Sequence, residues 1–242
     1  MKKPIDIVMT TWKREEFTIL VLRALRKNTN YPYRLILIDN GSSEEAREVY
    51  ASQSDIYIKL DRNIGLEAAK HLGMQFVESS YFISTDNDIL VPKRIDNGMD
   101  WLERLIKLME ENPEYGAIAL RPQILVGTNE KEVFSDASKD VTEFSHVPGY
   151  MRIMDTNLVC GLGAWKDKRE LRGHEELWIS KRMRAKNWKV GWATNIRCWH
   201  LFGEDGNWGY GDMEVKDHGH NPIWPMPVDD LKQVTNDFLG NS

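Results

Sequence analysis

Two carboxylates one residue apart form the feature of this sequence that is best suited to chemistry. Asp86 and Asp88 flank Asn87, shortly after the apolar run 81–83, which predicts a buried strand. Mg²⁺ and Mn²⁺ prefer oxygen ligands and commonly bind one or two carboxylates together with substrate phosphates. Asp and Asn also favour ordinary turns, so the triplet alone fits either interpretation. The surrounding elements must therefore decide between a metal site and a turn.

The segments before this triplet alternate between strand-like and helix-like patterns. Apolar runs predict strands, and apolar residues at helical spacing predict the helices between them. Ser42 followed by Glu45 matches a capping box, which predicts a helix running through Val49. This order predicts an α/β protein with a doubly wound, mostly parallel sheet flanked by helices. The strands are expected at 5–9, 35–38, 56–58 and 81–83, and the helices at 15–25, 42–49 and 65–77.

Polar residues follow each of the four predicted strands. Doubly wound sheets bind ligands at the carboxyl ends of their strands, so these residues are expected to line one crevice. Strand-to-helix turns are often polar because Asp, Asn and Ser cap helices, but four in succession favour a site. The segments are Thr10-Thr11, Asp39-Asn40, Asp61-Arg62-Asn63 and Asp86-Asn87-Asp88.

The second half is less regular. The sequence predicts an amphipathic helix at 98–111, a strand at 116–120 and a hairpin or loop within 121–150. A further helix at 176–186 and a strand at 188–192 follow. Residues 203–227 are rich in Gly, Trp, His and Pro without periodicity, which predicts an irregular tail before a short helix at 229–238.

The composition limits the class of protein. The chain has 242 residues, of which 41% are hydrophobic and 29% charged, as in soluble globular proteins. Its formal net charge of -5 provides no global attraction to nucleic acid or anionic membranes. With only two cysteines, a disulfide framework is not expected. The sequence shows neither a signal peptide nor an apolar run of the roughly 18 residues that span a membrane, so a cytoplasmic protein is expected.

Several motifs of the first ninety residues occur in the order known from one enzyme family. Residues 7–14 look like a first strand with a Thr-Tyr-Asn-Arg turn, and 37–42 is similar to a Val-Asp-Asn-Gly-Ser element. Residues 63–65 match an Asn-x-Gly motif, and the triplet at 86–88 occupies the position of a DxD motif. The sequence thus resembles the family 2 glycosyltransferases, which have the GT-A fold, use nucleotide-sugar donors and usually invert the anomeric centre.

The second half resembles the family more loosely. The segment from His174 to Leu177 resembles the Gly-Glu-Asp segment that supplies the catalytic base, which makes Glu176 the expected base and Glu175 the second choice. Residues 186–190 look like the family's Ala-Gly-Tyr-Arg-Ile, and 198–200 like its Val-Tyr-His. The usual Gly-Gly-Phe-Asp-Glu motif is not evident.

The resemblance implies a GT-A domain over 1–202 and assigns roles within it. Residues 1–90 would form the nucleotide-binding half, 91–202 the acceptor half, and 203–242 a tail or lid. Mn²⁺ or Mg²⁺ would be bound by Asp86, Asp88 and His200. Asp39 would accept hydrogen bonds from the donor base, and Asp86 would contact its ribose. The expected donor-binding residues are Thr10, Thr11, Arg14, Asp39, Asn40, Asn63, Gly65, Lys70, Asp86 and Asn87.

The expected reaction is metal-dependent transfer of a sugar from a nucleotide-diphosphate sugar, with UDP as the expected nucleotide, to an acceptor hydroxyl with inversion. One alternative is a nucleotidyltransferase, but such enzymes usually carry a glycine-rich basic loop after the first strand, and 10–14 contains no glycine. The other is a nucleotide-sugar-binding module without catalysis; the presence of Glu175, Glu176, Asp88 and His200 argues against it.

The acceptor half carries a local excess of cations. Between 166 and 189 there are nine Lys or Arg residues and four acidic residues. Such a region suits an anionic acceptor, whether a phosphorylated glycan, a lipid-linked sugar or nucleic acid. A solvated helix face would explain the same excess without any ligand.

Overall fold

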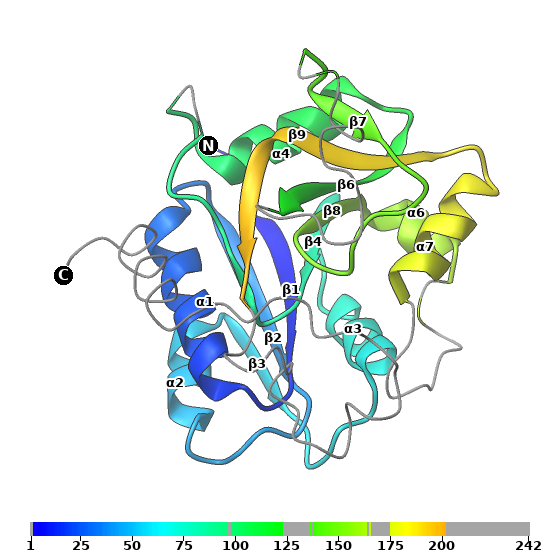
Figure 1. Ribbon diagram of the computed structural model, residues 1–242. Coiled ribbons are helices and arrows are strands. Elements are labelled where there is room, and N and C mark those ends of the chain that lie inside the picture. Colours follow the sequence, from blue (N-terminus) through cyan, green and yellow to red (C-terminus); the bar gives the residue numbers. More distant parts are fainter. Residues whose placement is uncertain are drawn as a thin grey trace, which may run out of the picture.

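The computed structural model describes residues 2–95, 98–122, 136, 138–163, 165 and 175–201. In this part of the chain, helices cover both faces of one sheet (Figure 1). No helix in the described ranges is both long and apolar enough to cross a bilayer. The expected tail at 203–242 lies outside the described residues.

The first half of the chain forms the parallel part of the sheet. Its strands lie in the order β3-β2-β1-β4, and all three pairs are parallel. Thr11 lies opposite Asp39, and Met9 lies opposite Thr85, so the carboxyl ends of these strands share one edge. The strands are β1 (Ile5–Thr11), β2 (Tyr33–Asp39), β3 (Ile56–Lys59) and β4 (Tyr81–Thr85).

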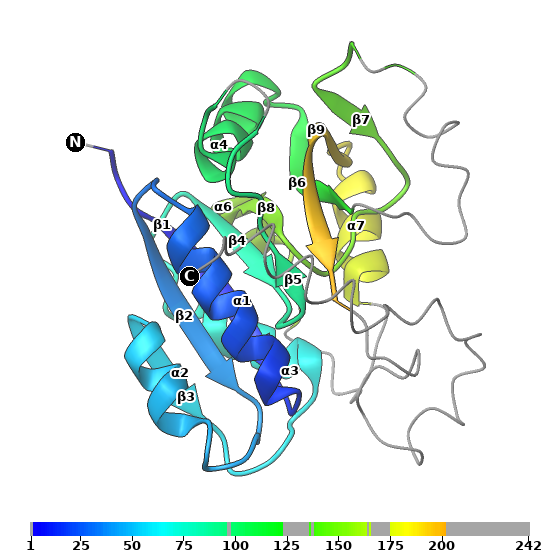
Figure 2. The ribbon, with the colours of Figure 1, turned by 60° about the vertical axis from the view of Figure 1, so that its left-hand side comes forward.

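The second half continues the same sheet with mixed strand directions. β8 lies between β4 and β6 and is antiparallel to both, whereas β9 is parallel to β6. β5 is antiparallel to the end of β9 and lies beside it (Figure 2). Ile89 lies opposite His200, which brings the 86–88 triplet near His200. These strands are β5 (Ile89–Leu90), β6 (Tyr115–Pro122), β7 (Val141–Glu143), β8 (Arg152–Asp155) and β9 (Lys189–His200).

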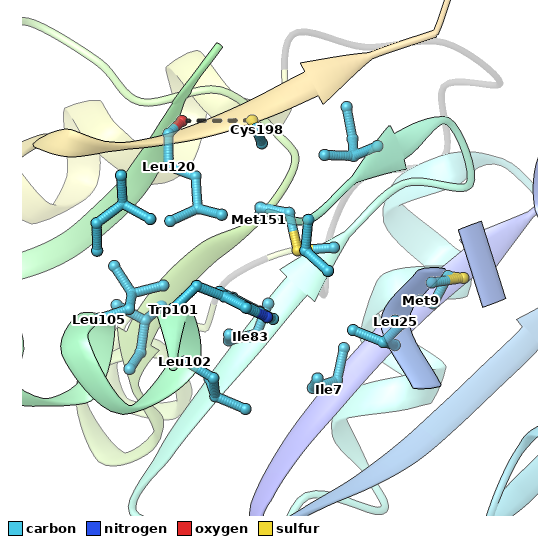
Figure 3. Close-up of a cluster of buried hydrophobic side chains, with 14 of the residues drawn as sticks. Ile7, Met9, Leu25, Ile83, Trp101, Leu102, Leu105, Leu120, Met151 and Cys198 are labelled. Carbon is cyan, nitrogen blue, oxygen red and sulfur yellow. Dashed lines mark hydrogen bonds between the residues drawn. The ribbon is translucent and has the colours of Figure 1, made fainter. Parts of the chain in front are cut away.

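Alternating apolar residues on the strands supply a core on each face of the sheet. In β1, Ile7 and Met9 belong to a cluster under α1, α2 and α4, whereas Val8 belongs to a second cluster under α3, α6 and α7. Figure 3 shows the first cluster, in which Trp101 of α4 lies beside Ile83 of β4. The helices are α1 (Glu15–Asn28), α2 (Arg47–Gln53), α3 (Leu66–Met74), α4 (Trp101–Glu111), α6 (Thr156–Gly161) and α7 (Glu175–Arg184).

The helix expected from the Ser42 capping box begins later than the sequence predicts. α2 starts at Arg47, and Ala46 is its N-cap. Ser42 instead joins two loops, because its hydroxyl accepts a hydrogen bond from Lys13 N at 3.1 Å and its own N–H donates to Asp39 Oδ1 at 2.8 Å. The capping-box prediction is therefore wrong, and Ser42 connects the ends of β1 and β2.

In the second half, the structure contains a longer strand than the sequence predicts and further elements that it does not predict. The strand expected at 188–192 continues to His200 as β9, and neither β8 nor α6 was expected. The hairpin or loop expected within 121–150 lies partly outside the described residues; β7 occupies 141–143 of it.

We expect Gly41→Ala to destabilise the protein. Gly41 has φ +93°, and an added Cβ would lie 2.8 Å from the backbone carbon of Arg62. Strain of this kind costs about 1–3 kcal/mol, and each kcal/mol lowers Tm by about 2–4 °C in a chain of this size. Thermal unfolding of Gly161→Ala serves as the control, because no atom lies within 4 Å of the added Cβ at that position. An equal Tm for both variants would contradict this reading of the turn.

Candidate active site

The loop after β4 is attached to the loop after β1 by one buried amide. Asn87 Nδ2 donates to Thr11 Oγ1 at 3.0 Å, to Thr18 Oγ1 at 2.8 Å and to Lys13 O at 3.3 Å. Thr11 and Asn87 are both buried. Their side chains therefore position the two loops and are not presented to a ligand.

The end of β2 is fixed in the same way. Asp39 is fully buried; Oδ1 accepts from Ser42 N, and Oδ2 accepts from the Tyr57 hydroxyl at 2.9 Å. Burial and the adjacent carboxylate raise the pKa of Tyr57, so its hydroxyl stays protonated as a donor. Both carboxylate oxygens that were expected to contact a donor base thus have internal partners.

Asn40 connects β2 to the loop before α3. Its Nδ2 donates to Asn63 Oδ1 at 2.8 Å, and its Oδ1 accepts from Ile64 N at 2.9 Å. Asn63 Oδ1 also accepts from Gly65 N at 2.8 Å, where φ is +95°. Asn40, Asn63 and Gly65 therefore form one hydrogen-bonded unit at the edge of the sheet.

Thr10, near the end of β1, differs from Asp39, Asn40 and Asn87. Its hydroxyl is buried and has no hydrogen-bond partner in the part of the chain that the structure describes. A buried hydroxyl without a partner is unfavourable, which is a reason to expect a ligand atom there.

Asp88 lies between a guanidinium and an imidazole. Arg14 Nη1 donates to Asp88 Oδ2 at 2.7 Å, and His200 Nε2 lies 3.3 Å from the same oxygen. Burial disfavours the charged carboxylate, but the charges of His200 and Arg14 outweigh it and lower the pKa of Asp88 to about 2. Asp88 is therefore a carboxylate at neutral pH.

Asp86 occupies a different environment. Its side chain is 29% exposed, whereas that of Asp88 is 6% exposed. Asp86 Oδ1 lies 3.1 Å from Lys70 Nζ. Asp86 is thus the more accessible of the two acidic residues.

The three expected metal ligands fit a divalent cation by chemistry but are not gathered around one point. Asp88 Oδ1 is buried without a hydrogen-bond partner among the described residues, and His200 lies beside Asp88. Carboxylate oxygen and imidazole nitrogen both suit Mn²⁺. In the described ranges, no three His, Cys, Asp or Glu residues are close enough to form a metal-binding cluster. Asp88 and His200 are therefore adjacent, whereas Asp86 pairs with Lys70.

Glu175, the second choice for base, is buried inside an ion cluster. Its Oε1 accepts from Lys70 Nζ at 2.6 Å. Its Oε2 accepts from Arg152 at 2.5 Å and from Trp165 Nε1 at 2.9 Å. Burial disfavours its charge, but Arg152 and Lys70 outweigh that effect and lower the pKa of Glu175 to about 2. Such a carboxylate is a poor proton acceptor.

Glu176, one residue later, has the opposite electrostatics. It is only partly buried. Burial and the negative charge of Glu175 raise its pKa. A carboxylate whose pKa is raised toward neutrality is better suited to take a proton from a hydroxyl. The structure thus gives the two adjacent carboxylates different pKa values, and this favours Glu176, the first choice from the sequence, over Glu175.

Lys70, expected beside the donor phosphates, is fully buried. Its ammonium donates to Glu175 and to Gly149 O at 2.8 Å, and it pairs with Asp86. Burial opposes protonation, but the charges of Asp86 and Glu175 raise the pKa of Lys70, so it remains a cation. It therefore acts inside the protein and exposes no surface to a phosphate in this structure.

Three residues of the site were not expected from the sequence: Tyr150, Arg152 and Trp165. Arg152 and Trp165 bind Glu175, and the ring of Tyr150 lies 5.0 Å from that of His200. A signal existed only for Arg152, which is a lone charge among the apolar residues 151–154. Tyr150 and Trp165 come from segments without a regular pattern.

Comparison with known sequences agrees with this arrangement. The sequence model of Glycosyl transferase family 2 matches residues 6–195. An undecaprenyl-phosphate 4-deoxy-4-formamido-L-arabinose transferase of Photorhabdus laumondii is 29% identical over 118 residues, which are 45% of this chain and 34% of that protein. A teichoic acid poly(glycerol phosphate) polymerase of Staphylococcus epidermidis is 24% identical over 90 residues, covering 35% of this chain and 12% of that protein. The chain thus matches about a third or less of these curated relatives.

Solved structures share the fold at low sequence identity. Residues 1–349 of TarS from S. aureus, in complex with UDP-GlcNAc, align with a TM-score of 0.64 and 13% identity over 84% of this chain and 60% of that chain. The mannosyltransferase PcManGT of Pyrobaculum calidifontis, in complex with GDP-Man and Mn²⁺, aligns with a TM-score of 0.64 and 14% identity over 83% of this chain and 57% of that chain. The family match covers most of the chain, and its sheet and helices have the arrangement of these enzymes. The chain belongs to glycosyltransferase family 2 and is a glycosyltransferase of the GT-A fold.

Proposed function

We propose that this glycosyltransferase transfers a sugar from a nucleotide-diphosphate sugar, with UDP the first candidate nucleotide, to an acceptor hydroxyl with inversion. The observation that carries the proposal is the contact of Lys70 with Asp86 at 3.1 Å and with Glu175 at 2.6 Å. It brings the loop of the expected DxD motif next to the first turn of α7, where Glu176 lies. The structural neighbours in complex with UDP-GlcNAc and GDP-Man support the class of donor.

The chain's own residues would divide the chemistry between them. Glu176 accepts the proton of the acceptor hydroxyl, whose oxygen attacks the anomeric carbon while the bond from that carbon to the diphosphate oxygen breaks. The products are a glycoside of inverted configuration and a nucleoside diphosphate. Asp88, His200 and Asp86 would hold Mn²⁺ or Mg²⁺, which when bound stabilises the negative charge of the leaving diphosphate.

We further propose a phosphate-bearing acceptor. The exposed side of α7 carries Lys181 and Arg184, and it continues from Leu177 and Trp178, which are 41% and 43% exposed. A basic and apolar surface close to Glu176 suits an acceptor with a phosphate and a hydrocarbon part. The names of the undecaprenyl-phosphate transferase and the teichoic acid polymerase support this class of acceptor. The cations expected at 166–172 lie outside the described residues.

The donor class is tested by calorimetric titration of UDP-, GDP-, dTDP- and CDP-sugars, each with Mn²⁺ and with EDTA. We expect one nucleotide to bind, only with Mn²⁺, and we expect Asp88→Asn to lose about tenfold or more in affinity because a charged metal ligand is removed. Asp140→Asn is the matched control, since Asp140 is an exposed partner of Arg104. Absence of binding to all four by folded protein would overturn the proposed donor class.

The base is tested with Glu176→Gln. We expect kcat to fall about 10²–10⁴-fold while the dissociation constant of the donor changes little, because general-base catalysis contributes in that range. For the unmodified protein, kcat/KM should fall as pH decreases through the raised pKa of Glu176, because protonation removes the base form. Steady-state kinetics across pH measure both effects. Full activity of Glu176→Gln would rule out this base.

The acceptor class is tested by charge reversal on α7. With a short-chain polyprenyl phosphate as acceptor, we expect the double variant Lys181→Glu and Arg184→Glu to raise the acceptor KM about tenfold, since each exposed charge pair contributes about 0.2–1 kcal/mol. The effect should weaken at high salt. Lys139→Glu is a control at another exposed cation. An unchanged KM, or transfer only to uncharged glycans, would contradict the proposal.

A further inference from the structure

Three charged residues from distant parts of the chain meet in the interior. Lys70 of α3, Arg152 of β8 and Glu175 of α7 are buried, with side chains 0% exposed. Removing charges from water is unfavourable, and apolar side chains of similar volume often stabilise a protein as well or better. Stability of the fold therefore gives a weak reason for an ion cluster here. A role in positioning the site gives a stronger one.

The outer contacts of the cluster lead to three segments of the candidate site. Lys70 pairs with Asp86 in the expected DxD motif, and it donates to Gly149 O. Arg152 Nη1 donates to Pro148 O at 3.4 Å. Glu175 belongs to the first turn of α7, directly before Glu176. The cluster thus connects the 86–88 loop, the 148–152 segment and the helix that carries the proposed base.

Glycine at position 149 leaves room for these contacts. A Cβ at Gly149 would lie 2.5 Å from Glu175 Oε1 and 3.2 Å from Lys70 Nζ. The next residue, Tyr150, packs against His200. Gly149 therefore contacts the ion cluster, and its neighbour Tyr150 contacts a proposed metal ligand.

The cluster also distinguishes the charges of the two neighbouring glutamates. The cations Lys70 and Arg152 balance the carboxylates of Asp86 and Glu175, and both oxygens of Glu175 are occupied. The charged groups that act on Glu176 are Glu175, Lys70 and Arg152. The negative charge of Glu175 raises the pKa of Glu176 by more than either Lys70 or Arg152 lowers it.

We propose that Lys70, Arg152 and Glu175 are positioning residues, which tie the DxD loop to the start of α7 and keep Glu176, in place of Glu175, available as the base. This inference rests on the proposed function. Glu175 fixes the direction of the first turn of α7 without touching the acceptor. Its negative charge also opposes the ionisation of Glu176 and so sets the pH at which the base becomes active.

Two variants distinguish the effect of the charge of Glu175 from the effect of its side-chain length. Glu175→Gln keeps the size but removes the charge, which leaves Lys70 and Arg152 in excess, so we expect the pKa of Glu176 to fall by about half a unit or more. Glu175→Asp keeps the charge but withdraws the carboxylate, so we expect an unmoved pKa and a kcat about 10–100-fold lower from misplacement of the base. Glu110→Gln, at an exposed residue of α4, is the control.

The pKa of Glu176 is read directly from a ¹³C-carboxyl titration of glutamate-labelled protein, with its resonance identified by its loss in Glu176→Gln. The acidic limit of kcat/KM should move to lower pH by the same amount. An unmoved titration in Glu175→Gln, or Glu175→Asp with full kcat, would overturn the inference. So would an inactive Glu175→Gln alongside an active Glu176→Gln, since Glu175 would then be the base.

Different results would contradict the proposed sugar transfer and the proposed positioning role of the ion cluster. An unmodified protein that transfers no sugar from any donor overturns the proposed function, whereas the titration still reports whether the cluster controls Glu176. If Glu175→Gln does not fold, Glu175→Asp decides, because a kcat within twofold of the unmodified value contradicts positioning. A lowered kcat with the donor dissociation constant unchanged supports it.

Discussion

The site depends on one ammonium that two carboxylates share. Lys70 Nζ lies 2.6 Å from Glu175 Oε1 and 3.1 Å from Asp86 Oδ1. Lys70 belongs to α3 in the first half of the chain, whereas Glu175 belongs to α7 in the second half, so this contact joins the two halves at the candidate site. Because the ammonium is fully buried, leaving it without either carboxylate would be strongly unfavourable. The sheet already joins the halves through β4 and β8, and this contact additionally fixes the start of α7 relative to the loop at 86–88.

Fixed charge then gives two adjacent glutamates different chemistry. Arg152 and Lys70 lower the pKa of Glu175 to about 2, while burial and the charge of Glu175 raise that of Glu176. Pairs of carboxyl groups whose pKa values are moved apart by their surroundings commonly divide structural and acid-base roles. The two pKa values differ because the side chain of Glu175 is buried among cations, whereas that of Glu176 is only partly buried.

Local sequence signals predicted the first half of the fold well and the second half only in part. The apolar runs of β1 to β4 and the polar residues at their ends are local patterns, so the sheet edge and most candidate residues could be found from them. Arg152 could not be assigned, because its position depends on pairing of β8 with β4 and β6, which are distant in sequence. Likewise, Ser42 matched a capping box but bonds to Lys13 from another loop.

Most polar side chains at the sheet edge bind one another, and this leaves few groups for ligands. Asn87, Asp39 and Asn40 use their polar atoms to hold loops together, which favours a rigid and preorganised edge. Asp86 and Glu176 are the carboxylates that remain partly exposed beside the buried cluster. Asp86 pairs with Lys70, and Glu176 follows Glu175 in α7, so a donor held near Asp86 and an acceptor activated by Glu176 would meet beside this ion pair. Rigid loops and a buried ion cluster would then fix the geometry that the transfer requires, without a contribution from the buried groups to the reaction itself.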